Sequence, residues 1–151
     1  MSLVTRIGHV AFYVKDLEKS VDYYCRKLGM RKAFDFRNDD GSIWIQYIEA
    51  SHEQFIELFP VKETKQCPGQ SFFHISLQVD DLDVTLKTLK ERGVLCYNGP
   101  EGALAKTEPL DKAFVACCNS KCAWTQDPDD NFIEFMELTE KSVHRHFKDN
   151  D

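Results

Sequence analysis

Alternating apolar and polar residues near the start of the chain predict a β-strand that leads into a helix. In residues 5–14, Val10, Phe12 and Val14 fall on one face and His9 falls on the other. After a predicted N-cap at Asp16 and before a stop at Gly29, apolar residues recur at helical spacing: Leu17, Val21, Tyr24 and Leu28. We expect this helix to pack on the apolar face of the strand.

Three more strands complete the first half of the pattern. Alternation predicts them over residues 30–37, 42–50 and 53–59, with a turn at residues 39–41 between the first two. Residues 5–60 therefore form a predicted βαβββ module.

The second half repeats this order over about residues 71–138. A strand at 71–79 puts Phe73, Ile75, Leu77 and Val79 on its apolar face, and a helix runs from a cap at Asp81 to Gly93. Further strands are predicted at 94–97, 113–118, 121–126 and 131–138. Glycine and proline near the start of residues 98–112 predict an irregular, mobile loop over a site. The polar composition of residues 139–151 predicts a C-terminal tail that forms either a helix or a frayed end.

The repeat also copies residues that packing alone does not require. His74 lies 65 residues after His9, and the FIELF segment around Glu57 returns 77 residues later as FIEFM around Glu134. Strand alternation places these four side chains on the face opposite the aliphatic residues. Two imidazoles and two carboxylates can bind a divalent metal. The alternative for each residue alone is a hydrogen-bonded structural histidine or a solvated glutamate.

Apolar residues share this predicted concave face with the four candidate ligands. An apolar surface with a few convergent polar groups suits a small-molecule site. The candidate pocket residues are Tyr13, Phe55, Phe59, Phe72, Phe132 and Met136. The faces of Trp44, Tyr47 and Trp124 stay open between this surface and the layer under the helices.

Composition narrows the class of protein. The 151 residues are the size of one domain, and we expect a single domain built from the two modules. A formal net charge of -6 argues against nucleic acid or an acidic membrane as partner. No apolar segment approaches a membrane span or an export signal, which predicts a cytoplasmic protein whose six cysteines are reduced. A zinc site at Cys117, Cys118 and Cys122 is disfavoured, because they lack a CxxC pair.

With these residues, the chain resembles the vicinal oxygen chelate superfamily, which includes glyoxalase I, bleomycin-resistance proteins and extradiol dioxygenases. HVAFYVKDLEKSVDYYCRKLGM and DPDDNFIEFMEL carry the resemblance, together with the four ligand positions. It implies an α+β fold in which two paired βαβββ modules form an open, cup-shaped mixed sheet with helices outside. It also implies a homodimer and one divalent ion, Ni, Co, Zn, Mn or Fe, held by His9, Glu57, His74 and Glu134.

The resemblance further implies an isomerase or epimerase of lactoylglutathione lyase type. Such enzymes act on a small 2-oxo or hemithioacetal substrate through a metal-bound enediolate, and a ligand glutamate moves the proton. Glu134 is the predicted proton shuttle, or Glu57 by pseudo-symmetry. Glutathione-dependent members generally carry an arginine and an asparagine where this chain has Tyr13 and Val61. The substrate is therefore expected to differ from the glutathione adduct.

Two other functions stay open. A fosfomycin-resistance-type transferase or an extradiol-type dioxygenase would use only His9, His74 and Glu134 as ligands. A non-catalytic protein of bleomycin-resistance type would instead hold a drug or metabolite in the phenylalanine-lined cup. Stoichiometric ligand binding without metal would favour this last reading.

Overall fold

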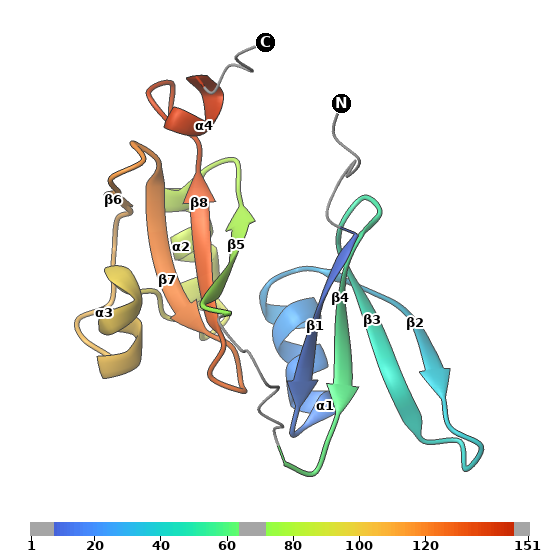
Figure 1. Cartoon of the computed structure of the whole chain (residues 1–151). Helices are drawn as coiled ribbons and strands as arrows, with labels where there is room; N and C mark the ends of the chain where they lie inside the picture. The colour runs from blue at the N-terminus through green and yellow to red at the C-terminus, as the bar shows by residue number, and fades with distance from the viewer. Residues whose placement is uncertain (1–7, 64–71, 147–151) are drawn as a thin grey trace. The chain divides into compact units, whose positions relative to one another are not determined.

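The structure of the chain is a computed structural model, which describes residues 8–63 and 72–146, the latter without the side chains of His144 and His146. The chain divides into two compact units, Met1–Gln70 and Ser71–Asp151, each with its own four-stranded mixed sheet (Figure 1). The predicted α+β class is confirmed. Among the described residues, no helix has the length and apolar character needed to cross a bilayer.

Unit 1 has the predicted βαβββ order. Its elements are β1 (His9–Val14), α1 (Leu17–Val21), η1 (Asp22–Lys27), β2 (Arg31–Arg37), β3 (Ile43–Ser51) and β4 (Gln54–Pro60). The sheet order is β1-β4-β3-β2, with β1 and β4 parallel and the other neighbours antiparallel. Residues 5–7 of the first predicted strand lie outside the described residues.

The first helix starts where the sequence predicts and then changes its winding. The Asp16 carboxylate accepts a hydrogen bond from the Lys19 N–H and caps α1. From Asp22 the helix continues as the π-helix η1, which ends before Gly29 at φ +80°, a conformation that favours glycine. The ring of Tyr24 stacks on Phe12, with centroids 6.4 Å apart. The helix therefore packs on the face of β1 opposite His9, as predicted.

Unit 2 repeats the strand order of unit 1 and has two additional helices, one before β6 and one after β8. Its elements are β5 (His74–Gln78), α2 (Leu82–Glu91), α3 (Gly99–Ala105), β6 (Phe114–Val115), β7 (Lys121–Gln126), β8 (Phe132–Glu137) and α4 (Val143–His146). The sheet order is β5-β8-β7-β6, again with one parallel pair, β5 and β8. Of the two alternatives for the C-terminal tail, a helix or a frayed end, its described part contains the short helix α4. Residues 147–151 lie outside the described residues.

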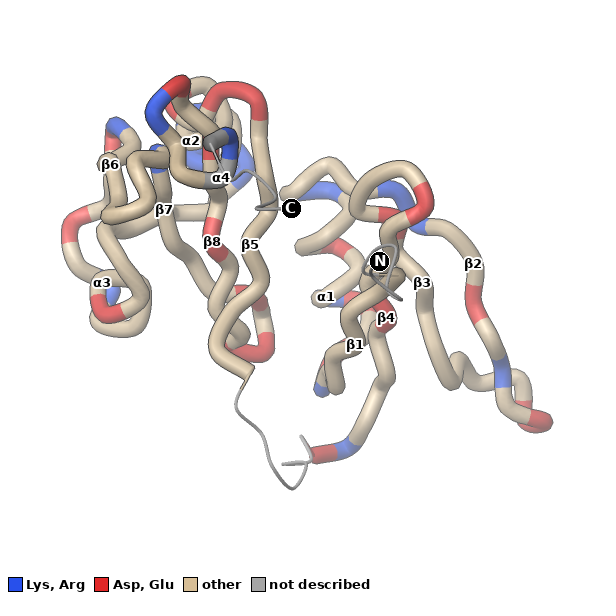
Figure 2. The backbone as a smooth tube through the Cα atoms, turned by 45° about the horizontal axis from the view of Figure 1, so that its top comes forward, with Lys and Arg blue, Asp and Glu red and all other residues tan. Residues whose placement is uncertain are grey.

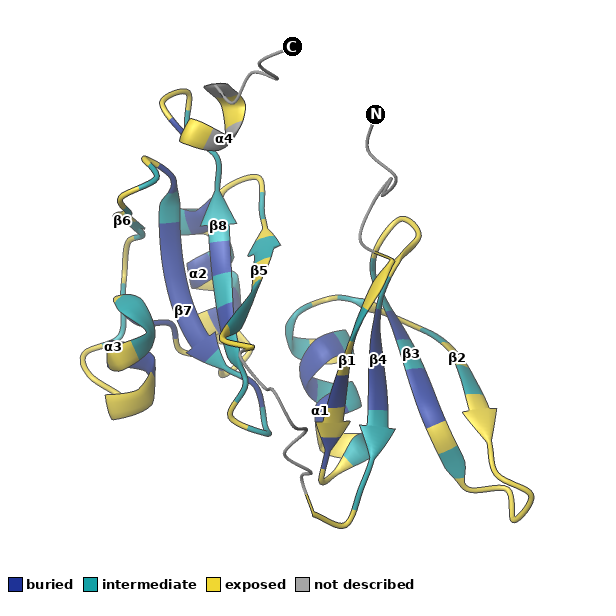
Figure 3. Cartoon of the chain, viewed as in Figure 1, coloured by how far each residue is buried: buried dark blue, intermediate teal, exposed yellow. Residues whose placement is uncertain are grey.

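Two layers of apolar side chains enclose the sheet of unit 2. Leu82, Leu86 and Leu89 of α2 are buried, and α2 contacts β7 and β8, the most deeply buried strands of the unit (Figure 3). α3 contacts β7 through a second cluster, Tyr97, Ala103 and Trp124, with Phe114 and Phe132 packed against it. Trp124 and Phe132 share the face of His74, so α3 packs on the candidate site's side of this sheet.

Three predictions about unit 2 were wrong. Residues 94–97 form no strand, and only an isolated bridge joins Tyr97 to Trp124. The predicted loop at 98–112 contains α3, because apolar Ala103 packs against Trp124 despite the neighbouring glycines and proline. Phe73 was predicted to lie on the apolar face of the strand, opposite His74. It precedes β5, where strand alternation does not apply, and its ring contacts His74, Trp124 and Phe132.

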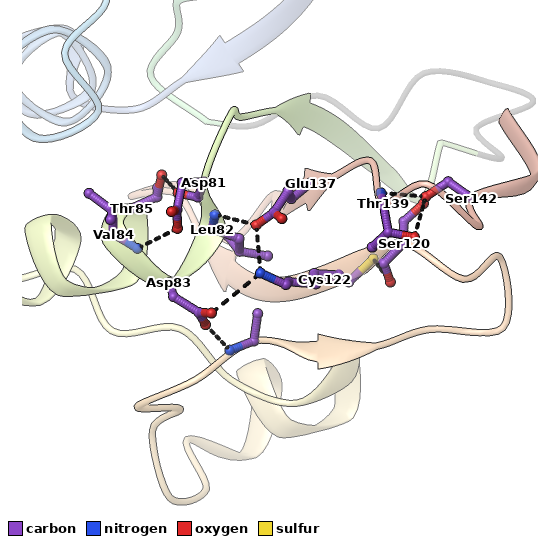
Figure 4. Close-up of polar contacts among 12 residues, drawn as sticks. Asp81, Leu82, Asp83, Val84, Thr85, Ser120, Cys122, Glu137, Thr139 and Ser142 are labelled. Carbon is purple, nitrogen blue, oxygen red and sulfur yellow. Dashed lines mark hydrogen bonds and ion pairs between the residues drawn. The ribbon is translucent and has the colours of Figure 1, made fainter. Parts of the chain in front are cut away.

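A polar network fastens the start of α2 to the sheet of unit 2. The Glu137 carboxylate accepts hydrogen bonds from the Leu82 N–H at 2.7 Å and from Lys121 Nζ at 3.1 Å (Figure 4). Lys121 Nζ also lies 3.4 Å from Asp83, whose other oxygen accepts from the Ala113 N–H. Beside it, the buried Ser120 and Ser142 hydroxyls hydrogen-bond at 2.9 Å. These contacts hold the segments on either side of β6 and the C-terminal turn in place.

Candidate functional site

Each unit brings one histidine and one glutamate together on neighbouring parallel strands. In unit 1, Glu57 of β4 lies beside Ala11 of β1, two residues along the strand from His9. In unit 2, Glu134 of β8 lies beside Ser76, again two residues from His74. Residues two apart on a strand share a face, so each glutamate points to the same side as the histidine of its unit. The predicted faces of all four side chains are confirmed within their own units.

The distances within the two pairs are nearly equal. Nε2 of His9 lies 3.6 Å from a Glu57 carboxylate oxygen, and Nε2 of His74 lies 3.7 Å from one of Glu134. Both separations exceed those of a hydrogen bond. Atoms that bind one ion at about 2.1 Å each lie about 3 to 4 Å apart. The donor types and spacing of each pair therefore fit a divalent metal.

The two pairs differ in exposure. The side chain of His9 is 53% exposed and that of His74 is 30% exposed, while both glutamates are largely covered. Nδ1 of His74 is buried and has no hydrogen-bond partner within the structure, so Nε2 is the nitrogen available to a ligand. In the chain from 8 to 63 and from 72 to 146, no three His, Cys, Asp or Glu side chains form a metal-binding group. The described residues thus contain two candidate ligand pairs, each within one unit.

Glu57 and Glu134 belong to the minority of acidic residues that lie inside strands. Asp and Glu gather instead in turns, such as residues 39–40, 80–83 and 127–130 (Figure 2). Both glutamates occur in central strands, β4 and β8, where flanking residues such as Ile56 and Ile133 are fully buried. The strand core therefore fixes the backbone of each candidate ligand.

The sequence did not decide which face of the sheet Tyr47 and Trp124 occupy, and the strand register now does. Tyr47 of β3 lies directly opposite Glu57, and Trp124 of β7 lies directly opposite Glu134. Both aromatic residues therefore lie on the candidate site's face, not under the helices. A hydrogen bond to the Glu57 carboxylate, assisted by burial, raises the pKa of Tyr47. The Trp124 ring contacts the His74 ring, with centroids 4.7 Å apart.

An exposed group of aromatic rings surrounds the pair in unit 1. Tyr47 stacks on Phe34 at 4.4 Å between centroids, and both rings contact Phe55 at 6.0 Å. Trp44 lies at 6.5 Å from Phe59, which resolves its face as well. Phe34 and Trp44 are 48% and 55% exposed. We call Phe34, Phe36, Trp44, Tyr47, Phe55 and Phe59 the aromatic surface of unit 1.

Five of the six predicted pocket residues lie on the expected faces of their own units, whereas Phe72 precedes β5, so that strand alternation does not fix its face. Tyr13 contacts Phe59, with ring centroids 6.1 Å apart, and Phe55 and Phe59 flank Glu57 on β4. Phe132 and Met136 flank Glu134 on β8, and Phe72 is exposed just before β5. Whether these residues bind a substrate stays a prediction. A separate cavity of about 350 Å³ in unit 1, lined by Leu17 and Gln46 among others, includes none of them.

Sequence reasoning did not assign Phe34, Phe36 or Cys122 to this face. Phe34 lies at a register shift between β2 and β3, where the alternation of residues no longer predicts which face of the sheet a side chain occupies. Cys122 is fully buried on β7, and its pKa is raised by burial and by the neighbouring Glu134. The 77-residue offset of the repeat could have placed it, since Ile45 occupies the equivalent position. The described cysteines, Cys25, Cys96, Cys117, Cys118 and Cys122, are free thiols.

Comparisons with known proteins identify a family that matches most of the chain. Residues 6–135 match the family described as Glyoxalase/Bleomycin resistance protein/Dioxygenase superfamily. The uncharacterized protein YraH of Bacillus subtilis (strain 168) is 27% identical over 88% of this chain and 98% of its own. A probable lactoylglutathione lyase of Vibrio cholerae is 28% identical over 87% of this chain and 90% of its own.

A solved structure shares the fold. The crystal structure of a superfamily member from Sphaerobacter thermophilus superposes with a TM-score of 0.65 at 23% identity. The similarity covers 91% of this chain and 100% of that one.

Proposed function

Because the chain belongs to the glyoxalase/bleomycin resistance protein/dioxygenase superfamily, we propose that it is a metal-dependent glyoxalase-like enzyme. The observation that carries the proposal is the repeated pair, His9 with Glu57 and His74 with Glu134, at 3.6 and 3.7 Å. In this proposal the four side chains hold one divalent ion, Ni, Co, Zn, Mn or Fe. The ion would supply Lewis-acid stabilisation of negative charge on two adjacent substrate oxygens.

The reaction proposed is isomerisation or epimerisation of a small 2-oxo or hemithioacetal compound. Glu134 takes the proton from the carbon next to the carbonyl. In isomerisation it returns this proton to the neighbouring carbon while the substrate hydroxyl proton moves to the former carbonyl oxygen, and in epimerisation an acid on the opposite face protonates the same carbon. Tyr13, Phe55, Phe59, Phe72, Phe132 and Met136 line the substrate pocket in this proposal and exclude water from the exchanging proton. The working unit is proposed to be a homodimer.

The substrate is proposed to lack the glutathione moiety. Relatives named probable lactoylglutathione lyase support the reaction type. Tyr13, however, presents a phenol that packs on Phe59, and Val61 offers no side-chain hydrogen bond. Neither residue can replace the charge or amide that glutathione-dependent members carry at these positions.

Elemental analysis of the purified protein tests the metal site. We expect one divalent ion for each four-residue ligand set, lost in His74→Ala and in Glu134→Ala. The protein loaded with Ni, Co, Zn or Mn is then offered methylglyoxal hemithioacetals of several thiols and 2-oxo thioesters. No stoichiometric metal, or metal indifferent to both substitutions, would remove the metal site. Stoichiometric metal without turnover of any of these compounds would remove the catalytic part.

A second candidate function is non-catalytic binding of a planar aromatic compound. The exposed aromatic surface of unit 1 favours it, because Phe34, Phe36 and Trp44 are each about half exposed and exposed apolar patches mark ligand or partner sites. Tight, stoichiometric binding of such a compound by metal-free protein would support this function over catalysis.

A further inference from the structure

The two candidate glutamates have different neighbours, although the repeat makes their positions equivalent. Tyr47 and Trp124 occupy the same place in the two units, because each lies directly opposite the glutamate of its own unit. Residues paired in this way have β-carbons only about 5 Å apart. A tyrosine at this place can donate its hydroxyl proton to the carboxylate opposite.

In unit 1, Tyr47 interacts with the glutamate opposite it. The Tyr47 hydroxyl hydrogen-bonds the Glu57 carboxylate, and the side chain of Glu57 is only 8% exposed. The Tyr47 ring is held by Phe34 at 4.4 Å, Phe36 at 5.8 Å and Phe55 at 6.0 Å. The phenol is therefore oriented by packing before it donates, and a hydroxyl-to-carboxylate bond is among the stronger hydrogen bonds.

In unit 2, the equivalent residue Trp124 contacts the histidine and not the glutamate through a polar group. The Trp124 indole packs against His74 at 4.7 Å and is buried with Tyr97 and Ala103 under α3. It carries no hydroxyl. The thiol of Cys122 lies beside Glu134, but it donates to the Ser120 carbonyl oxygen, and a thiol is in any case a weak donor.

We propose that Tyr47 is a positioning residue that holds the Glu57 carboxylate in a fixed orientation as a metal ligand. Glu134, which has an indole and not a phenol directly opposite it, is then the glutamate that leaves the ion and moves the proton. The pseudo-symmetry of the site is broken by this one difference between phenol and indole. This inference rests on the proposed function.

A mutant cycle with Co(II) tests this role, because Co(II) binding is visible in the absorption spectrum. Tyr47→Phe keeps the ring that packs on Phe34 and removes only the hydroxyl. We expect Co(II) affinity to fall about 10-fold in Tyr47→Phe, the usual effect of losing a hydrogen bond to a ligand. Because Glu134→Ala and Glu57→Ala are both expected to lose the ion, the comparison between these two backgrounds is made with the metal-free protein.

Two controls separate this role from a general structural effect. Tyr24→Phe removes another phenol of unit 1, on the face where the helix packs on Phe12, and should leave Co(II) affinity unchanged. In the metal-free protein, Tyr47→Phe should lower the urea midpoint of unfolding in the wild-type and Glu134→Ala backgrounds but not in Glu57→Ala. The change in the urea midpoint measures the contribution of the hydrogen bond between Tyr47 and Glu57 to stability, and it does not depend on the affinity of the variants for metal.

The outcomes distinguish this inference from the proposed function. Stoichiometric Co(II) on the wild-type protein with unchanged affinity in Tyr47→Phe would overturn the role of Tyr47 alone. Equal effects of Tyr47→Phe in the two glutamate backgrounds would do the same. A wild-type protein that binds no Co(II) would overturn the proposed function and this role with it.

Discussion

At the scale of single residues, Glu137 connects the start of α2 to β7 and β8, the inner strands of the unit 2 sheet. Its carboxylate accepts from the Leu82 N–H and from Lys121. Glu137→Ala leaves both donors without this acceptor, and we expect the free energy of unfolding to fall by about 1–2 kcal/mol. Urea unfolding measures this loss. Lys90→Ala, which removes an exposed ion pair with Asp111, is the control and should cost less than about 0.5 kcal/mol; equal losses would contradict the prediction.

Asp83 should make the stability of unit 2 depend on pH. The hydrogen bond from the Ala113 N–H, with Lys121 nearby, lowers the pKa of Asp83 from its ordinary 3.8. A native pKa below the unfolded one contributes stability above the unfolded pKa, and this stability is lost as the pH falls through the native value. The wild-type advantage over Asp83→Asn in urea unfolding should therefore be full at neutral pH and shrink below about pH 4. An advantage that is constant or grows toward low pH would refute this.

The sequence predicted the His and Glu pairs at residue level but not their neighbours. Alternation is reliable inside regular strands such as β1, β4 and β8, so His9, Glu57 and Glu134 fell on the correct faces. Tyr47 could not be assigned, because β3 lies between register shifts that reset the alternation. Convergence of the two pairs on one ion stays a prediction.

At the scale of elements, α3 is the helix that covers the candidate site's face of unit 2. Ala103→Asp would put a carboxylate against Trp124 and Tyr97, where burial of a charge is costly. We expect hydrogen exchange over residues 97–107 to accelerate at least about 10-fold, equivalent to 1.4 kcal/mol. In a Trp44→Phe background, Trp124 fluorescence should shift to the red.

Leu104→Asp is the matched control for this prediction. It introduces the same charge on the same helix, at a side chain that is 66% exposed. Its exchange rates and fluorescence should stay close to those of the wild-type protein. If both substitutions act alike, α3 is held by its own helical propensity and not by Trp124.

The spacing of apolar residues along the sequence explains which elements were predicted. Where this spacing is regular, it predicted the bounds of β1 to β5, α2, β7 and β8 to within a few residues. The π-winding of η1 was not predicted, because Tyr24 and Leu28 fit an α-helical spacing equally well. α3 was missed because Gly99, Pro100 and Gly102 disfavour a helix locally, and only contact with β7 stabilises it.

At the scale of the whole molecule, metal binding should stabilise both units together. An ion present at 100 times its dissociation constant stabilises the native state by about 2.7 kcal/mol. If the proposed ion takes ligands from both pairs, hydrogen exchange in both β4 and β8 should slow when metal is added. Glu134→Ala should then remove the added protection of β4 as well as that of β8. Protection of β4 that survives this substitution would show that the pairs act separately.

Strand pairing in the described chain never crosses from one half to the other: β1 to β4 pair among themselves, as do β5 to β8. A gene divided within codons 64–71 would therefore separate no paired strands of the described chain. Two co-expressed polypeptides, each carrying one histidine and one glutamate, could then be recombined with halves from other proteins. The internal repeat makes this chain a natural starting point for a split, metal-dependent protein.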